Sequence, residues 1–239
     1  MGFWVNKFLL DYVYSQDTDW NRKRSAGQVS WTDAGPAEAM KELAALWKNG
    51  YVEPGFLSIA DNQTASYLVS GKAAMLYSGP WMFKQIEEAD PNFEIGFFAL
   101  PDRKGTRYIF GLPQPTGWAI SSDAANDPNR LKFIKQFLHF FYSSDEYRRY
   151  LEAVSGIPAT KEAIPYKTTE PMQKVLDIIN DSRSVKLHSL EHYWGENHMP
   201  PAFRNIFYKL ITDYLADKIS LDEMLLKADQ AWDNAVVQQ

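Results

Sequence analysis

The stretch "SGKAAMLYSGPW", residues 70–81, decides how this chain is expected to fold. A short helix over the preceding residues should end at Gly71, because glycine commonly terminates helices. "AAMLYSG" then predicts a buried strand, and Gly79–Pro80 turns the chain into a helix that presents Trp81 at its start. In α/β folds a ring at such a turn lies at the carboxyl edge of a sheet, where ligands bind. The same spacing also fits a Trp81 that is buried in the core.

Helices and strands alternate along the rest of the chain. "FEIGFFALP" (93–101) and "WAIS" (118–121) read as further strands, and a helix from Pro36 should stop at Gly50. The first 20 residues and the tail from about residue 170 indicate helices, whereas "DTDWNRKRSAGQ" (17–28) indicates a polar loop. Strands alternating with helices predict an α/β fold.

Two helix starts carry a capping-box pattern, a serine followed three residues later by a glutamate. The first is Ser143 with Glu146, and the second is Ser220 with Glu223. We therefore expect one helix to begin after Ser143 and the last helix to begin after Ser220.

The segment 128–142, "PNRLKFIKQFLHFFY", predicts a helix that is apolar on most of its surface. A helix with apolar residues far beyond one stripe should be buried on most sides. The strands expected at 73–79 and 93–101 are distant in sequence. Either this helix packs on the other elements of the chain, or it requires a sheet that the chain does not contain.

Composition excludes several classes of protein. The net charge is −5, and no basic run is longer than "RKR" at 22–24, so a nucleic-acid partner is not expected. There are no cysteines, which rules out disulfides, a thiolate nucleophile and a cysteine–zinc cluster. Aromatic residues make up 15% of the chain, and Trp and Tyr suit surfaces that are apolar on one side and wet on the other.

The order of motifs resembles one family. "GYVEP", "SGKAAMLYSGPW", "FEIGFFALPD", "GWAISSDAANDPNRLKFIKQFLHFFYSSDEYRRYL" and "GIPATKEA" follow one another as in extracellular solute-binding proteins of the maltose-binding type. These proteins are the receptors of carbohydrate ABC importers, and the likeness runs from about residue 31 to the end. It implies a type II periplasmic-binding-protein-like α/β fold. It also implies capture of a sugar or oligosaccharide between two lobes, delivery to a membrane permease, and no catalysis, metal or cofactor.

The resemblance also implies how the chain is divided between lobes. Residues 1–112 and 160–239 correspond to the C-terminal lobe, and 113–159 to a returning segment of the N-terminal lobe. The main sheet of that lobe, on which the helix at 128–142 would pack, is expected upstream, together with an export leader. The start "MGFWVNKFLLDYVYS" does not resemble a secretory signal. The expected location is the periplasm, or a lipid anchor at the outer face of the cell membrane.

The family's stacking tryptophan falls on Trp81. Its glycine-rich cleft loop falls on Gly111 to Trp118, where Pro113 and Pro115 replace the usual glycines. The region around "LHSLEHYWGENH" (187–198) corresponds to the return into the C-terminal lobe, which often lends groups to the cleft. The full set of expected ligand-binding residues is Trp81, Trp194, Gln114, Thr116, Gly117, His198, Glu196 and Trp31.

Two enzyme interpretations and one structural interpretation compete with a binding protein. His188, Glu191 and His192 spell H-x-x-E-H, the ligand order of one class of zinc peptidases, although the third ligand is undetermined and glycine and prolines follow closely. A glycoside hydrolase would need a carboxylate pair that sequence spacing cannot select. A stand-alone lobe that dimerises through the helix at 128–142 is the third.

Overall fold

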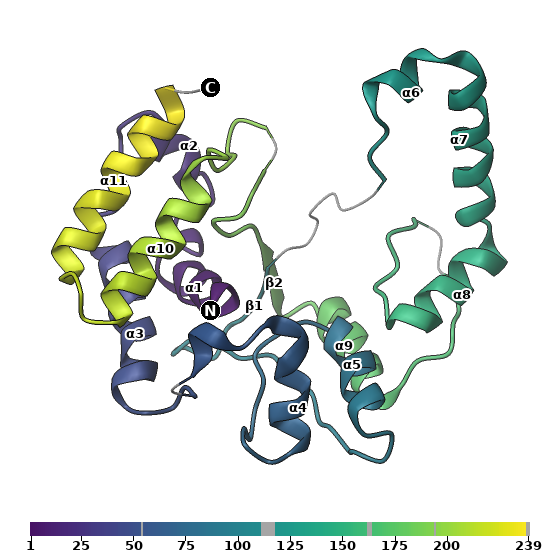
Figure 1. Cartoon of the computed structure of the whole chain (residues 1–239), viewed down its shortest axis with the longest axis horizontal. Helices are drawn as coiled ribbons and strands as arrows, with labels where there is room; N and C mark the ends of the chain where they lie inside the picture. Colours follow the sequence, from purple (N-terminus) through teal and green to yellow (C-terminus); the bar gives the residue numbers. More distant parts are fainter. Residues whose placement is uncertain (54, 111–117, 162–163, 194, 238–239) are drawn as a thin grey trace. The chain divides into compact units, whose positions relative to one another are not determined.

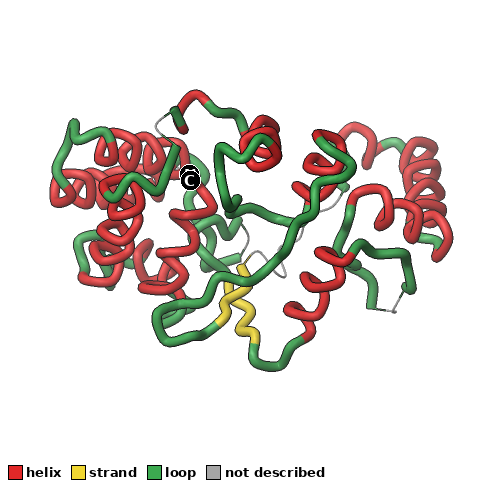
Figure 2. Tube along the Cα trace, turned by 90° about the horizontal axis from the view of Figure 1, so that it is seen from below, coloured by secondary structure: helices red, strands yellow, loops and turns green. Residues whose placement is uncertain are grey.

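A computed structural model describes residues 1–53, 55–110, 118–161, 164–193 and 195–237. The contacts group into two compact units. Unit 1 comprises Met1–Ile59, Ala99–Gln114 and Ser182–Gln239, and unit 2 comprises Ala60–Phe98 and Pro115–Asp181. Helices dominate in both (Figure 2). These units differ from the lobes that the resemblance implies, because 60–98 and 160–181 group with the segment 115–159. The lobe assignment stays a prediction.

Unit 1 is a helical assembly with one small sheet (Figure 1). The hairpin of α10 and α11 packs together, α1 packs on α3, and α11 contacts both α2 and α3. Its elements are α1 (Gly2–Leu9), the π-helix η1 (Leu10–Tyr14), α2 (Trp20–Ser25), α3 (Ala34–Lys48), the 3-10 helix η2 (Phe56–Ser58), β1 (Arg107–Phe110), β2 (Ser184–Leu187), α10 (Phe203–Leu215) and α11 (Leu221–Val237).

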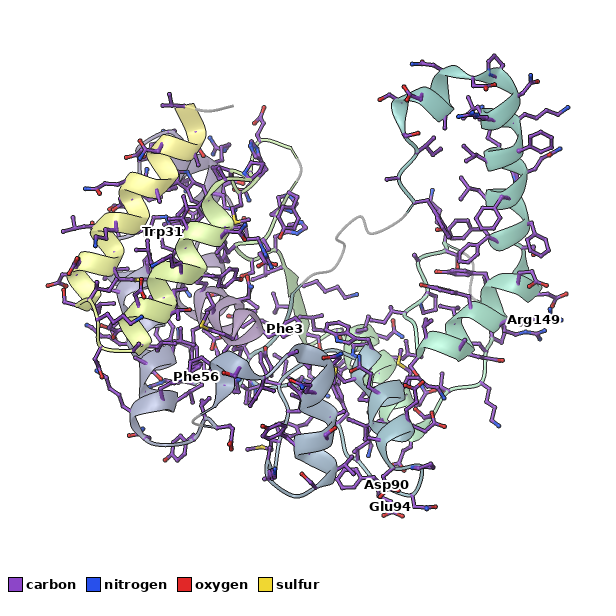
Figure 3. All side chains as sticks on the ribbon, in the orientation of Figure 1. Phe3, Trp31, Phe56, Asp90, Glu94 and Arg149 are labelled. Carbon is purple, nitrogen blue, oxygen red and sulfur yellow. The ribbon has the colours of Figure 1, made fainter. Side chains whose placement is uncertain are left out.

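The core of unit 1 is built around Trp31, which is 0% exposed and lies among the helices (Figure 3). Its ring centroid lies 4.5 Å from that of Phe207 on α10 and 4.7 Å from that of Trp20 on α2. Trp232 of α11 is 4.7 Å from Phe203, centroid to centroid. Because these rings come from four separate segments, burying them fixes α2, α10 and α11 against one another.

A buried ionic contact reinforces the same junction. The guanidinium of Arg24 on α2 donates from Nε to Oδ1 of Asp229 on α11 at 2.7 Å, and from Nη1 to Asp233 at 2.8 Å. The backbone N–H of Trp31 donates to the same Asp229 oxygen at 2.8 Å. Arg24 is only 5% exposed, so its buried guanidinium is paired with two carboxylates, of which Asp229 is half-buried and Asp233 exposed.

The sheet differs from the sequence prediction. β1 and β2 pair in parallel, with Arg107 opposite Ser184 and Phe110 opposite Leu187, and they lie side by side in Figure 2. The strands predicted at 73–79, 93–101 and 118–121 do not form. A strand exists only where a partner completes its hydrogen-bond ladder, and in the described residues these three segments have no such partner.

Unit 2 contains the Gly79–Pro80 turn and the helix that follows it. Met82 and Ile86 of α5 pack with Ala65 of α4 to form a small buried cluster. Gly71, with φ of +73°, follows α4 as predicted. The elements of this unit are the 3-10 helix η3 (Asp61–Gln63), α4 (Thr64–Val69), α5 (Trp81–Ala89), α6 (Ser122–Asn126), α7 (Pro128–Phe141), α8 (Ser144–Val154) and α9 (Glu170–Asn180).

α7 is the predicted apolar helix, but none of its described residues is buried. Phe133 is 68% exposed, and Phe137 lies 5.3 Å from Trp118, ring centroid to ring centroid. The prediction that the chain itself buries this helix on most sides is therefore wrong for the described residues. The alternative, that α7 requires a sheet from elsewhere, stays a prediction.

Three local expectations change. The predicted polar loop 17–28 contains α2, because Trp20, Asn21 and Arg24 are buried there. The capping box at Ser143 does not form, since its hydroxyl donates backward to the Phe140 carbonyl at 2.7 Å. At Ser220 one of the two hydrogen bonds of the capping box forms, in which the Glu223 N–H donates to the Ser220 hydroxyl at 3.1 Å.

Two phenylalanines test this division of buried and exposed rings. Phe207→Ala should lower the free energy of unfolding by about 3–5 kcal/mol, because it leaves a cavity beside Trp31. The control, Phe133→Ala, should change it by less than about 0.5 kcal/mol because that ring is exposed. Urea denaturation followed by circular dichroism measures both. Equal losses would contradict the core described above.

Candidate functional site

Trp81 is the first residue of α5, and its side chain is 44% exposed. The N–H of Met82 donates to the Gly79 carbonyl at 3.1 Å, and that of Phe83 to the Pro80 carbonyl at 3.0 Å. These bonds begin the helix, and burial of Met82 holds it against α4. The interpretation of Trp81 as a core residue is therefore wrong for the described chain. An indole held at a packed helix start can offer an apolar surface to a ligand.

In unit 1, a second candidate element follows β2. We define the β2 loop as residues 188–193 and 195–199. The side chain of Asn21, fully buried on α2, donates to the backbone carbonyls of Leu190 at 3.2 Å and Asn197 at 3.3 Å, while its own oxygen accepts from the Tyr14 hydroxyl at 2.6 Å. One buried amide thus holds two points of the loop.

Asn197 ties the loop to α2 and to the segment before it. Its side-chain oxygen accepts the N–H of Arg22 at 2.9 Å, and its amide donates to the carbonyl of Thr18 at 2.6 Å. Gly195 has φ of +69°, a conformation that favours glycine, and its carbonyl lies 2.7 Å from Nδ1 of His198. These hydrogen bonds give the loop a defined shape.

Glu191 holds the first part of the loop, residues 188–193, against α10. One of its oxygens, Oε1, accepts from the Tyr208 hydroxyl at 2.6 Å and from Nε of Arg204 at 3.0 Å. Burial raises the pKa of Tyr208 well above its usual range, and the negative charge of Glu191 raises it further. Tyr208 therefore remains protonated and acts as a donor to the carboxylate.

His188 and His192 lie close together, with ring centroids 4.1 Å apart. Nδ1 of each ring is buried and has no hydrogen-bond partner among the residues that the structure describes. Burial lowers the pKa of His192, and the neighbouring His188 and His198 lower it further. The folded chain therefore favours the neutral form of His192.

The geometry does not support the zinc interpretation. His188 follows a strand rather than lying on a helix, and Glu191 is engaged by Arg204 and Tyr208. Over the described ranges, no three His, Cys, Asp or Glu side chains come together as metal ligands.

The eight predicted ligand residues differ in their surroundings, and some of them are not described by the structure. The prediction that Trp31 binds the ligand is wrong, because α2, α10 and α11 enclose its ring in the core of unit 1. A ring buried there cannot serve as a stacking surface. Glu196 is exposed and His198 half-buried on the β2 loop, and Trp81 is exposed in unit 2. Trp194, Gln114, Thr116 and Gly117 lie outside the described residues.

Sequence reasoning missed the residues that shape the β2 loop. Asn21 stood in a stretch interpreted as polar loop, and Arg204 and Tyr208 were counted only as part of a helix. The only available signal was Glu191, which the sequence offers only within the competing zinc interpretation. Asn21 lies more than a hundred residues from the loop carbonyls that it binds, so no local pattern marks that contact.

Unit 2 also contains an open groove of about 670 Å³. Phe83, Ile86 and Phe93 contribute its apolar part, and Glu87 and Glu94 are acidic lining residues, the latter labelled in Figure 3. None of the predicted ligand residues lines it. This groove is therefore distinct from the surface that Trp81 presents.

Comparison with known proteins identifies the family. Residues 2–147, more than half of the chain, match the model of the bacterial extracellular solute-binding proteins. The chain belongs to this family. Among its relatives by sequence, a multiple sugar-binding protein of Streptococcus mutans is 25% identical over 80% of this chain and 44% of its own length. A binding protein of Brucella abortus is 25% identical over 57% of this chain and 32% of its own.

Solved structures show that the solute-binding fold is shared. A chitin oligosaccharide binding protein superposes with a TM-score of 0.81 at 19% identity, covering 98% of this chain and 56% of its own. The binding protein MsmE of Bacillus subtilis gives 0.67 at 14% identity, with coverages of 98% and 58%. The chain thus spans less than half the length of these sequence relatives and somewhat more than half that of these structures. In the described helices, none is both long and apolar enough to cross a membrane.

His192 makes the stability of this family member depend on pH. Because the pKa of His192 is lowered in the folded state, the unfolded chain takes up a proton first as pH falls from about 7 to about 5, and the stability conferred by the neutral ring is lost. His192→Gln should reduce this loss, as judged by thermal melts at each pH. His139→Gln, on the exposed surface of α7, is the control and should leave the pH profile unchanged. Identical profiles for all three proteins would contradict the prediction.

Proposed function

We propose that this chain supplies much of a receptor that captures a sugar or oligosaccharide and delivers it to an ABC import permease. The observation that carries the proposal is the half-exposed indole of Trp81, held at the start of a packed helix. Membership of the solute-binding family supports it, as do the names of a sugar-binding and an oligosaccharide-binding relative.

The chemistry of the proposed site follows from the shape of a sugar. A pyranose has an apolar face of C–H bonds that stacks on an indole, and a rim of hydroxyls that planar polar side chains bind. Trp81 would be the platform. Glu196 and His198 of the β2 loop are proposed to bind hydroxyls, and Tyr193, 43% exposed on the same loop, is a further candidate ring.

The remaining predicted contacts belong to the proposal on the strength of the resemblance alone. Trp194 would be a second ring, and Gln114, Thr116 and Gly117 would line the cleft from the loop before Trp118. Zinc chemistry is not part of this proposal, because Glu191 is engaged by α10.

The aromatic face of α7 supports a receptor with two lobes. The face exposes three aromatic rings, those of Phe133, Phe137 and Phe140. Exposing so many apolar rings to water is unfavourable. We propose that a sheet of the N-terminal lobe covers this face in the complete receptor. A second copy of the chain is the competing cover, and a mass that rises with concentration in sedimentation would reveal it.

The receptor would act without catalysis at the outer face of the cell membrane, free in the periplasm or held by a lipid anchor. Closure of two lobes is a hinge motion, and a ligand stabilises the closed state only by its higher affinity for that state. The closed form would then be the one that the permease recognises.

A thermal-shift panel tests the proposal on this chain and on a version extended upstream. The panel contains mono- and oligosaccharides, chitin oligosaccharides among them, and zinc with and without EDTA. A ligand present at about 100 times its dissociation constant should add about 2.7 kcal/mol of stability. Stabilisation by a sugar, unaffected by EDTA, is the expected result. Stabilisation by zinc alone, reversed by EDTA, would overturn the proposal in favour of a metal site.

Trp81→Ala should weaken binding of the sugar that stabilises the parent by about 1–3 kcal/mol, because the stacking surface is lost. The unfolding free energy should change little, since the ring is exposed. Trp47→Ala is the control with the opposite pattern, because Trp47 packs on Phe56 in unit 1, at 5.0 Å between ring centroids. It should lower stability and leave affinity unchanged in calorimetric titration. Unchanged affinity in Trp81→Ala would remove Trp81 from the site.

A further inference from the structure

Gly79 lies directly beneath the ring of Trp81. A Cβ atom placed on Gly79 would lie 2.0 Å from Cζ3 of the indole, 2.2 Å from Cη2 and 2.5 Å from Cε3. Such separations are far shorter than any van der Waals contact between carbon atoms. The six-membered part of the ring therefore occupies the space that a side chain at position 79 would fill.

The backbone of Gly79 does not itself require glycine. The described glycines with positive φ are Gly27, Gly50, Gly71, Gly105 and Gly195, and Gly79 is not among them. Gly79 directly precedes Pro80, and residues other than glycine adopt extended conformations without strain at the position before a proline. The reason for glycine at this position is therefore space for the ring rather than backbone conformation.

We propose that Gly79 is a positioning residue for ligand binding, whose missing side chain lets the Trp81 ring rest against the main chain and present its exposed surface as a fixed platform. This inference rests on the proposed function for its ligand, a carbohydrate. One side of the indole is covered at Gly79, so the exposed 44% of Trp81 lies away from that contact. A platform held in one orientation binds more tightly than a mobile one, because less side-chain freedom is lost on binding.

The inference predicts a specific defect. In Gly79→Ala the start of α5 should persist, because the hydrogen bond from Met82 uses the main-chain carbonyl of residue 79. The indole lies at the end of a side chain that can rotate, so it should give way and leave the platform position. The variant should therefore fold normally and bind poorly.

Ligand-free protein labelled with 5-fluorotryptophan provides the first measurement. Fluorine NMR should give a resonance for each of the 8 tryptophans, and the one missing in Trp81→Phe belongs to residue 81. Gly79→Ala should shift that resonance and leave those of the unit 1 core in place. The matched control is Gly96→Ala in the same unit, where an added Cβ meets no atom within 4 Å and no resonance should move by a comparable amount.

Titration with the oligosaccharide that most stabilises the parent provides the second measurement. Gly79→Ala should weaken binding by about 5- to 150-fold, the range corresponding to loss of a stacking contact. In a Trp81→Ala background it should cause no further loss, because there is no ring left to displace. Gly96→Ala should bind like the parent. Circular dichroism and thermal melts confirm that each variant is folded.

The outcomes separate this inference from the proposed function. A resonance of Trp81 that does not move in Gly79→Ala overturns the positioning role, whatever the protein binds. A shifted resonance with unchanged sugar affinity overturns the role of this pair in binding. If no sugar stabilises the parent, the proposed function fails, and the spectrum of the ligand-free variants alone decides whether Gly79 sets the ring position.

Discussion

Unit 1 depends on the burial of aromatic rings around Trp31. The ring joins segments that are far apart in sequence, since it contacts Trp20 near the beginning of the chain and Phe203 and Phe207 near its end. Once α2 is held by this core, Asn21 is in place beneath the β2 loop and satisfies two of its carbonyls. The hydrophobic core therefore sets the shape of the β2 loop, because it positions the buried amide of Asn21. This loop is the one proposed to bind sugar hydroxyls.

Trp31 and Trp81 show how neighbouring residues decide what a tryptophan does. Trp31 is surrounded by rings and by the Arg24–Asp229 contact, so it contributes only to stability. Trp81 begins a helix whose apolar residues pack elsewhere, and a glycine two positions earlier makes room for its ring. The same side chain becomes a core residue in one case and a surface in the other, which composition alone cannot distinguish.

The sequence predicted helices better than strands, for a physical reason. Proline, glycine and apolar spacing are local, and they placed α3, α4, α5 and α7 close to their observed bounds. A strand depends on its partner: Arg107–Phe110 pairs with Ser184–Leu187 across more than seventy residues, and neither was predicted. Likewise, Trp81 could be recognised from its turn. By contrast, Asn21 acts on a loop more than a hundred residues away, and Arg204 and Tyr208 act on Glu191 from the helix that follows the loop. None of these contacts follows a helix or strand period, so the sequence does not mark them.

The central claim is that the surface ring of Trp81, and not the buried ring of Trp31, meets the sugar. Adding the stabilising oligosaccharide to 5-fluorotryptophan-labelled protein tests it most directly, because both rings are observed in one fluorine spectrum. The account predicts that the Trp81 resonance moves in a saturable manner with sugar concentration, whereas that of Trp31 stays within its original linewidth. A saturable response with no change at Trp81 would contradict the account and place the sugar elsewhere on the chain.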